Sequence, residues 1–553
     1  MKRGVVTQDN FTEGAAATRM PAGEKSVGGG GIGLAKLVAA GILLSRIAGL
    51  LRESIFAHYF GNSDSADAFK AAFRIPNMLQ NLFGQGVLSA SFIPVYSRLL
   101  AQAKQREANR LAVEVGALLS LAMVILALLG VLAAPYLMTL VAPGFHGAKR
   151  ALGVSLVQIL FPGAALLTLS AWCLGILNSH NRFFASYAAP VAWNAAIIAA
   201  MLLYGGYRSQ TNLAAVVAWG AVIGAGFQFA VQLPQTLKLL GRFDRGFAQT
   251  RGALKSVAAN FFPVLGGRGV VQISAYVDNI FASFLPAGAV AAFNYAQIVY
   301  FLPVSLFGIS IAAAELPAMS RAGGPSLEMA GIIRARLNSA LRHIAFLVTP
   351  SAAAFVLIGD VIVGAIFQSG RFSYADALYV WGVLAGSSVG LLAVTMGRLY
   401  SSAYYALWDT RTPLKFALVR VALTGVLGYF CALVLPGLLG FDRRWGVAGL
   451  TASAGVSGWA EFALLRIGLN RRIGPTGIDR VFVFQLWLIA GAAGIAALAV
   501  KLWFAPTEPR LRALVVLPIY LGVYLGAARW LRVPELKRLM LTLSPRRASA
   551  PPA

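Results

Sequence analysis

Charged side chains stand inside two long apolar segments near the N-terminus, residues 32–60 and 66–99. The charged side chains that could bind a ligand or an ion are Arg46, Arg52, Glu53, Asp67, Lys70 and Arg74. A charge at the centre of a bilayer costs roughly 2.5 to 3.5 kcal/mol, so such side chains face a partner or a water-filled cavity. Because like charges on adjacent segments repel unless an anion neutralises them, the pattern predicts an anion-binding chamber. Snorkelling or ion pairing near an interface is the structural alternative.

Helical spacing predicts which of these side chains share a face. At 100° per residue, Arg46 and Glu53 lie on one face of the first helix and Arg52 on another. The second helix has one polar stripe, formed by Asp67, Lys70, Arg74 and Asn81. Pro76 and the Gly84-Gln85-Gly86 step interrupt this helix, and broken helices expose backbone groups only where they line a cavity. The first two helices are therefore expected to wall the chamber.

A second polar group lies in residues 254–285. Four of its side chains fall within about 60° of one another on a helix: Arg268, Gln272, Asn279 and Ser283. Asp278 points away from that stripe. A lone acid inside a membrane often binds a proton or a cation, so Asp278 is a candidate site for coupling to a monovalent cation gradient or to the membrane potential. A structural ion pair with a neighbouring helix is the alternative.

The residues of common catalytic sites are missing or scattered. Cys173 and Cys431 stand in separate apolar runs, and four histidines have no metal-ligand spacing. There is no Gly-x-x-x-x-Gly-Lys-[Ser/Thr] loop and no polar connection long enough to hold a catalytic domain. We therefore expect a protein that is not an enzyme, with no metal and no cofactor.

The elements that must position these charges are transmembrane helices. Of 553 residues, 58% are hydrophobic and 12% are charged, and the mean hydropathy is +0.71. Uncharged runs of about 20 residues cross roughly 30 Å of hydrocarbon as helices. Helices of a soluble bundle would each carry a polar stripe, whereas most of these are apolar all round. We predict an all-α polytopic protein with about fourteen spans: 32–60, 66–99, 109–134, 150–177, 185–206, 213–239, 254–285, 288–319, 332–358, 376–407, 413–436, 446–468, 481–504 and 511–531.

The net charge of +27 is distributed like that of a membrane protein rather than a nucleic-acid-binding protein. Alternate connections are rich in Lys and Arg, and the loops at 61–65 and 286–289 contain neither. By the positive-inside rule the basic connections are cytoplasmic, which predicts a multi-pass protein of the cytoplasmic membrane with both termini inside. Residues 1–31 are expected to be a disordered cytoplasmic tail, and residues 532–553 a second tail.

A weak internal repeat predicts the domain organisation. Residues 53–60, Glu-Ser-Ile-Phe-Ala-His-Tyr-Phe, resemble residues 278–285, Asp-Asn-Ile-Phe-Ala-Ser-Phe-Leu. Parallel repeats support rocking of two lobes about a central cavity. Residues 32–240 would form the N-lobe with helices one to six, residues 253–468 the C-lobe with helices seven to twelve, and residues 481–531 two additional helices.

Two adjoining motifs resemble the MurJ/MviN family of lipid II flippases. They are Ser45-Arg-Ile-Ala-Gly-Leu-Leu-Arg-Glu53 and Ala66-Asp-Ala-Phe-Lys-Ala-Ala-Phe-Arg-Ile-Pro-Asn77, followed by Leu82-Phe-Gly-Gln-Gly86 and Phe92-Ile-Pro-Val95. The resemblance implies fourteen helices, a cationic cavity and a hydrophobic groove beside the last two helices for a polyprenyl tail. It also implies export of a lipid-linked peptidoglycan precursor, lipid II, from the inner to the outer leaflet.

The resemblance assigns functional arginines to Arg46 and Arg52, with acidic partners at Glu53 and Asp67. Together with the residues argued above, the candidate substrate-binding set is Arg46, Arg52, Glu53, Asp67, Arg74, Asn77 and Arg268. The expected partners are lipid II and membrane lipids. The sequence departs from the family where Gln80 and Gln85 replace an Arg and a Glu, and where Ile298 replaces an Arg of the eighth helix. We expect Arg268 to replace that lost contact, unless it merely snorkels at a helix end.

Three other functions compete with the flippase. A drug or polysaccharide-lipid exporter of the same superfamily has the same fold, but cationic drugs would be repelled by an arginine-rich cavity. A membrane-embedded transferase needs a general base or metal-binding carboxylates at one leaflet, and the sequence has no such acidic pair. A homologue that has lost transport is compatible with Gln80, Gln85 and Ile298.

Overall fold

The computed structural model describes residues 30–206, 208–241, 252, 254–255, 257–259, 261, 276–321, 327–503 and 508–537. Apart from one isolated β-bridge between Ser369 and Phe372, the regular structure of this part is helical. Helices satisfy all their backbone groups within the segment, as hydrocarbon requires. Residues 1–29 and 538–553 of the expected tails, and half of the seventh predicted span, lie outside the described residues. Residues 532–537 of the expected second tail are described, and Glu535 there is buried and pairs with Arg342 at 2.6 Å, so this stretch packs on the helices instead of forming a free tail.

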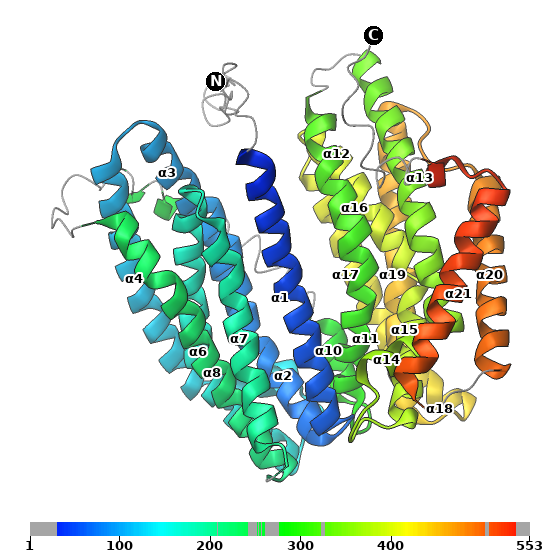
Figure 1. Cartoon of the computed structure of the whole chain (residues 1–553), viewed down its shortest axis with the longest axis horizontal. Coiled ribbons are helices and arrows are strands. Elements are labelled where there is room, and N and C mark those ends of the chain that lie inside the picture. The colour runs from blue at the N-terminus through cyan, green and yellow to red at the C-terminus, as the bar shows by residue number, and fades with distance from the viewer. Residues whose placement is uncertain are drawn as a thin grey trace, which may run out of the picture.

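The first half of the chain forms one group of helices, which we call the N-lobe (Figure 1). Its members are α1 (Gly30–Phe60), α2 (Asp64–Leu79), α3 (Ser89–Ala101), α4 (Gln105–Leu132), α5 (Ala134–Val141), α6 (Gly147–Ser179), α7 (Phe183–Tyr204) and α8 (Gln210–Leu240). Gly220 and Gly224 let α8 approach α7, because a Cβ at these positions would lie 2.6 Å from Ala200 Cβ and 2.8 Å from Trp193 O. Such small-xxx-small pairs are typical of helix contacts in membranes.

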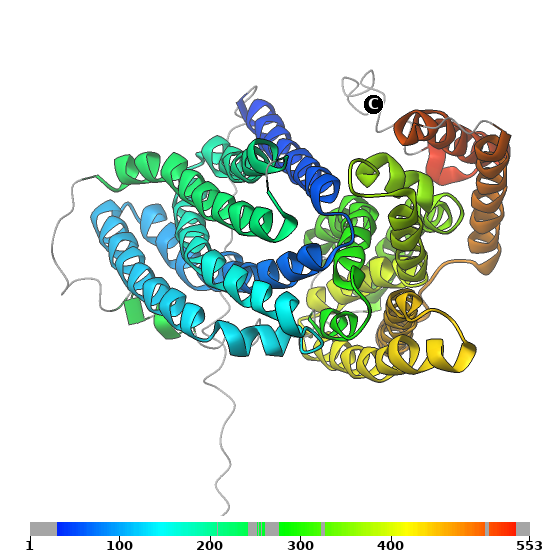
Figure 2. The same ribbon diagram turned by 90° about the horizontal axis from the view of Figure 1, so that it is seen from below.

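The second half forms the C-lobe, with two further helices at its outer edge (Figure 2). The C-lobe contains α10 (Val277–Ser283), α11 (Ala289–Pro303), α12 (Ser310–Ser320), α13 (Leu327–Leu357), α14 (Gly359–Phe367), α15 (Tyr374–Ser388), α16 (Leu391–Ala406), α17 (Arg411–Tyr429), α18 (Leu435–Leu439) and α19 (Gly446–Ile473). The outer pair is α20 (Arg480–Trp503) and α21 (Pro509–Trp530). A 3-10 turn, η4 (Arg443–Trp445), precedes α19.

Three spans contain a π-helical segment. These segments are η1 (Gln80–Leu88) between α2 and α3, η2 (Val304–Ile309) between α11 and α12, and η3 (Phe430–Val434) between α17 and α18. The first contains the Gly84-Gln85-Gly86 step, and the second follows Pro303, which has no N–H to donate. The interruption expected in the second span is confirmed. Because π-helical turns often occur at functional sites, the segments that follow α2 and α11 suggest that these two helices belong to the site.

The two lobes meet at one end and diverge at the other. In Figure 1 their helices converge near the loops that follow α1 and precede α11, and they splay apart toward the end where α1 begins. We call these the closed end and the open end. Cross-lobe element contacts are α2 with α11, α1 with α14 and α5 with α10.

Eight described helices are long and apolar enough to cross a membrane, and joining α15 to α16, which meet at 43°, gives nine. The predicted boundaries agree with the helices to within a few residues in most spans, for example 213–239 against α8 and 481–504 against α20. The all-α polytopic architecture with two lobes is confirmed. The count of fourteen stays a prediction, since the span 254–285 is described only in part.

Candidate functional site

A buried ion cluster joins α1 to α2 inside the N-lobe. The Glu53 carboxylate accepts from Arg52 Nη2 at 2.7 Å and also pairs with the Lys70 ammonium. Helical geometry puts Arg52 and Glu53 on different faces, but the long guanidinium side chain bends back to its neighbour. The exposed fractions of the Arg52 and Glu53 side chains are 16% and 12%. One carboxylate opposes two cations, so the cluster keeps a single excess positive charge, and both cations are already engaged with a counter-charge.

Aromatic rings surround the same cluster. The Arg52 guanidinium lies 5.2 Å from the Trp193 ring and 5.7 Å from the Phe73 ring. The Lys70 ammonium lies 4.2 Å from the Phe56 ring and 5.2 Å from the Tyr295 ring of the C-lobe. Cation–π contacts stabilise cations that have lost water. They hold both cations in defined positions between α1, α2 and α7.

Arg46 lies farther along α1 toward the open end and is exposed. Its Nη1 donates to Ser305 Oγ of η2 at 3.3 Å, which makes it a cross-lobe contact. The two α1 arginines therefore differ in role: Arg52 is held within the N-lobe, and Arg46 reaches the other lobe at a π-helical segment. An exposed guanidinium at this place can exchange its serine partner for a ligand.

Asp67 belongs to the closed end. It is fully buried, and its two carboxylate oxygens accept from Ala291 N at 2.7 Å and Gly288 N at 2.8 Å, at the N-terminus of α11. Lys149 Nζ of α6 donates to the same carboxylate at 2.5 Å. A carboxylate at a helix N-terminus satisfies free N–H groups and interacts favourably with the helix dipole. Asp67 thus joins the lobes.

Several other hydrogen bonds cross between the lobes at the closed end. They are Tyr295 Oη to Gly61 O (3.1 Å), Asn62 Nδ2 to Asp376 Oδ1 (3.2 Å), Arg371 N to His58 O (2.8 Å), Gly144 N to Ser283 Oγ (3.1 Å) and Asn279 Nδ2 to Val141 O (3.3 Å). Gly288 has φ +86°, and a Cβ there would lie 2.5 Å from Asn62 O. The two lobes therefore approach too closely at this point for any residue but glycine.

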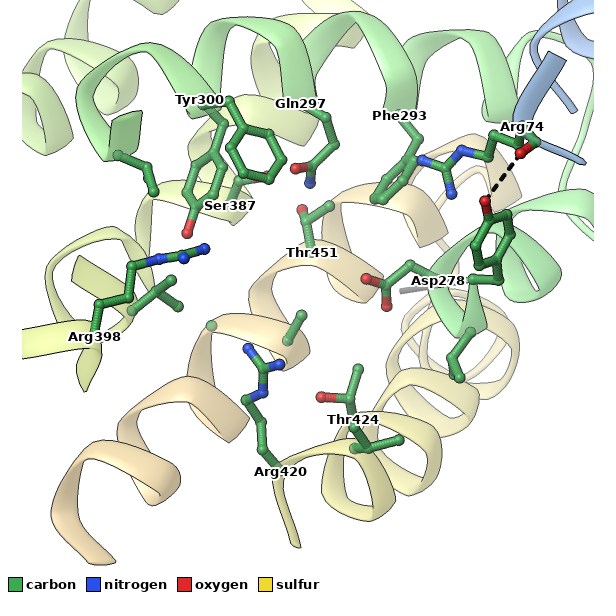
Figure 3. Close-up of a pocket in the computed structure, with 18 residues that line it drawn as sticks. Arg74, Asp278, Phe293, Gln297, Tyr300, Ser387, Arg398, Arg420, Thr424 and Thr451 are labelled. Atoms are coloured by element: carbon green, nitrogen blue, oxygen red, sulfur yellow. Dashed lines mark hydrogen bonds between the residues drawn. The ribbon is translucent and has the colours of Figure 1, made fainter. Parts of the chain in front are cut away.

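A cavity of about 420 Å³ lies between Arg74 of the N-lobe and seven elements of the C-lobe, α10, α11, η2, α15, α16, α17 and α19. Its polar lining consists of Arg74, Tyr276, Asp278, Gln297, Tyr300, Ser387, Arg398, Arg420, Thr424 and Thr451. Figure 3 shows these side chains converging on one space, with Arg398 and Arg420 opposite Arg74 and Asp278. Ligand sites are roughly 300 to 1,000 Å³, so this cavity has the size of a ligand site.

Three arginines and one aspartate give the cavity an excess of positive charge. The Arg74 guanidinium stacks 5.4 Å from the Phe293 ring and 5.7 Å from the Tyr276 ring, and Tyr276 Oη donates to Arg74 O at 3.0 Å. Arg420 Nε pairs with Glu461 of α19 at 3.2 Å. Oδ1 of Asp278 is buried without a hydrogen-bond partner among the described residues. The cavity can hold an anion next to the arginines, and Asp278 is available to a proton or a small cation.

The predicted site residues are thus divided among different places. Arg74 and Asp278 share the cavity, Arg52 and Glu53 share the N-lobe cluster, and Asp67 lies at the closed end. The half-buried Asn77 lies on α2 one turn beyond Arg74. Arg268 and Gln272 lie outside the described residues. Ile298 packs against the apolar core beside Gln297.

Sequence reasoning missed Arg398 and Arg420. Both stand inside apolar segments that were predicted as spans, 376–407 and 413–436, so the signal that marked Arg46 and Arg52 was present there too. The candidate residues named from the sequence all stand in the first, second and seventh predicted spans. Among the described residues, no three His, Cys, Asp or Glu side chains gather to hold a metal ion.

An apolar groove of about 470 Å³ lies on the other side of α11. Its lining is drawn from α11, η2, α13, α14 and α21: Val299, Leu302, Pro303, Leu306, Phe307, Phe346, Leu347, Pro350, Ser351, Ala354, Phe355, Ile362, Tyr520, Leu521, Tyr524 and Leu525. The Tyr520 and Tyr524 hydroxyls donate to Pro350 O and Phe346 O at 2.7 Å each. Because these hydroxyls are already satisfied, the groove offers an apolar surface to a ligand.

Comparison with known proteins identifies what the chain resembles. Residues 56–518 match the family model described as lipid II flippase MurJ. The lipid II flippase MurJ of Burkholderia cenocepacia is 31% identical over 439 residues, which cover 78% of this chain and 82% of the relative. The probable lipid II flippase MurJ of Bdellovibrio bacteriovorus is 30% identical over 523 residues, which cover 92% and 96%.

Two solved structures share the fold. A lipid II flippase MurJ in an inward closed conformation superposes with a TM-score of 0.72 at 23% identity, covering 90% of this chain and 99% of that chain. An inward-facing multidrug resistance transporter of the MATE family, of the MOP superfamily, gives a TM-score of 0.62 at 15% identity, covering 79% and 98%.

Proposed function

The chain belongs to the lipid II flippase MurJ family, and from this premise we propose that it moves lipid II from the inner to the outer leaflet of the cytoplasmic membrane. Lipid II has an anionic diphosphate, a sugar-peptide head and a long isoprenoid tail. Its head cannot cross hydrocarbon unaided. Flipping changes no covalent bond, so the protein acts as a transporter.

This proposal rests on one observation: α11 separates a polar, arginine-lined surface from an apolar one. Phe293, Gln297 and Tyr300 face the arginine-lined cavity. Val299, Leu302 and Pro303 face the apolar groove beside α21. An amphiphile with an anionic head and an isoprenoid tail fits this arrangement, because the head can enter the cavity while the tail stays in the groove. A drug that is a compact cation fits neither surface.

We propose that the open end faces the cytoplasm, as the distribution of basic loops predicts. The structure then corresponds to a state that receives substrate from the inner leaflet. Release on the other side requires the closed end to separate and the open end to close, which is rocking of the two lobes. The hydrogen bonds of Asp67 to Gly288 and Ala291 would break in this step.

The individual residues have distinct proposed roles. Arg46, Arg74, Asn77 and Arg268 contact the head group, and Arg52 joins them when the lobes move and its pairing with Glu53 loosens. Glu53 and Asp67 hold cations and backbone groups in the state that awaits substrate. Charge-assisted hydrogen bonds from guanidinium groups suit a diphosphate, since their fork geometry matches phosphate oxygens.

Asp278 is the proposed coupling site for a monovalent cation or for the membrane potential. Its buried Oδ1 has no hydrogen-bond partner among the described residues, so it is open to a proton or a small cation. We expect Asp278→Asn to weaken the dependence of transport on an ion gradient or on potential in reconstituted vesicles. An unchanged dependence would assign Asp278 to structural charge balance with the cavity arginines.

The decisive experiment is rescue after depletion. The full chain is expressed in a bacterium whose own lipid II flippase is switched off, and growth and the appearance of lipid II in the outer leaflet are measured. We expect both to be restored. A chain that reaches the membrane but restores neither would be a homologue without this transport activity.

A further inference from the structure

We propose that Arg398 and Arg420 of the C-lobe, together with Arg74 of the N-lobe, bind the diphosphate of the lipid-linked substrate. The inference rests on the proposed function and assigns the diphosphate site within it. The expectation that Arg268 makes up for the missing arginine at Ile298 stays a prediction, and Arg398 and Arg420 would add to that contact. The three arginines come from α16, α17 and α2, so they meet only through the packing of the two lobes.

The geometry points to a single ligand site. Arg398 and Arg420 extend from neighbouring helices into the cavity, and Arg74 approaches from the opposite wall (Figure 3). Arg420 is nine residues into α17 and therefore about 14 Å along its axis from Arg411, at a depth where snorkelling to the nearer interface is difficult. Ile298 does not line this cavity, whereas its neighbour Gln297 does.

Direct ion pairing distinguishes this cavity from the N-lobe cluster. The single Glu53 carboxylate contacts both Arg52 and Lys70, so each cation of that cluster lies against a counter-charge. Within the described residues, neither Arg74 nor Arg398 forms an ion pair with a carboxylate, and Arg420 has only Glu461. Asp278 is the one acidic side chain in the lining. Three arginines against Asp278 and Glu461 leave one excess positive charge, and Arg74 and Arg398 are the two guanidinium groups without a directly paired carboxylate, so an anionic diphosphate would be attracted to them.

The lining also supplies suitable donors. Arginine forms paired N–H···O bonds with phosphate oxygens, and hydroxyls of Tyr300, Thr424 and Thr451 lie in the same lining. One anion held by Arg74 on one side and by Arg398 and Arg420 on the other would draw the lobes together around it. Substrate binding would thus favour closure of the open end.

The test compares ligands that differ by one phosphate. Affinities of the purified full chain in detergent are measured by calorimetry for farnesyl diphosphate and farnesyl phosphate. We expect the chain to prefer the diphosphate, and Arg398→Gln and Arg420→Gln each to weaken diphosphate binding by about tenfold or more while affecting the monophosphate less. Arg398→Lys, which keeps the charge but not the fork, should recover part of the preference.

Arg208→Gln is the matched control, because Arg208 is exposed near the closed end and contacts the Tyr204 ring instead of the cavity. It should leave both affinities unchanged. Melting temperatures show whether each variant folds. If a glutamine variant does not fold, its affinities are replaced by those of Arg398→Lys or Arg420→Lys. An unchanged diphosphate preference in the folded Arg398 and Arg420 variants would overturn the inference. This outcome differs from a failure of the proposed function, in which the unaltered chain itself would not transport lipid II.

Discussion

At the scale of single residues, the Arg52–Glu53–Lys70 cluster separates a binding role from a structural one. Removal of Arg52 leaves Glu53 paired with Lys70, whereas removal of the Glu53 charge leaves two cations together in a buried place. Breaking a buried pair costs about 3 to 5 kcal/mol when one charge is left uncompensated. The two substitutions should therefore fail in different ways.

We expect Arg52→Ala to abolish rescue of a flippase-depleted strain at a normal membrane level of the protein. Glu53→Gln should instead lower the melting temperature and the amount of protein in the membrane. Growth, membrane abundance and thermal unfolding of each variant are measured side by side, with Arg208→Ala as the exposed control. Full activity of Arg52→Ala would remove Arg52 from the substrate pathway.

At the scale of elements, Asp67 connects α2 to the N-terminus of α11 and so holds the closed end. Asp67→Asn removes the charge that pairs with Lys149, and it can keep only one of the two backbone contacts, because one carboxylate oxygen becomes an NH2 group that cannot accept. We expect a shift toward the state open on the other side, measured as greater reactivity of a cysteine at Ala287 with an impermeant thiol reagent. Asp64→Asn is the control, since Asp64 also pairs with Lys149 but its side chain is 62% exposed. Equal reactivity in both variants would show that Asp67 does not hold the lobes together.

The groove beside α21 gives a second prediction at this scale. Ser351 lies on α13 in the groove lining, and Val356 lies on the same helix outside it and is exposed. Ser351→Trp should fill the groove and slow transport of lipid II, but it should have little effect on an analogue with a short isoprenoid chain. The Val356→Trp variant should transport lipid II and the short-chain analogue at the rates of the unaltered chain. Transport is measured in vesicles, and equal slowing of both substrates would place the tail elsewhere.

At the scale of the whole molecule, the two ends of the V-shaped arrangement in Figure 1 must face opposite sides of the membrane. We expect a cysteine at Ala287, at the closed end, to react with an impermeant thiol reagent added outside intact cells. A cysteine at Gln105, an exposed residue at the open end, should react only after the membrane is permeabilised. The reverse pattern would invert the orientation and with it the assigned direction of opening.

The sequence by itself determined the spans and the broken second helix. Hydrocarbon forces each apolar segment to satisfy its own backbone, so the positions of α8 and α20 follow from local composition. The cost of a buried charge likewise marked Arg52, Glu53 and Asp67 as informative before any packing was known.

Only the tertiary structure decided which charges meet. The sequence marks Asp67 as a candidate site residue, but its hydrogen-bond partners at the N-terminus of α11 lie more than two hundred residues away in sequence and could not be foreseen. Arg398 and Arg420 join Arg74 because two lobes pack against each other. Helical periodicity places a side chain on a face of its own helix, but the partner of that face depends on contacts between helices that are distant in sequence.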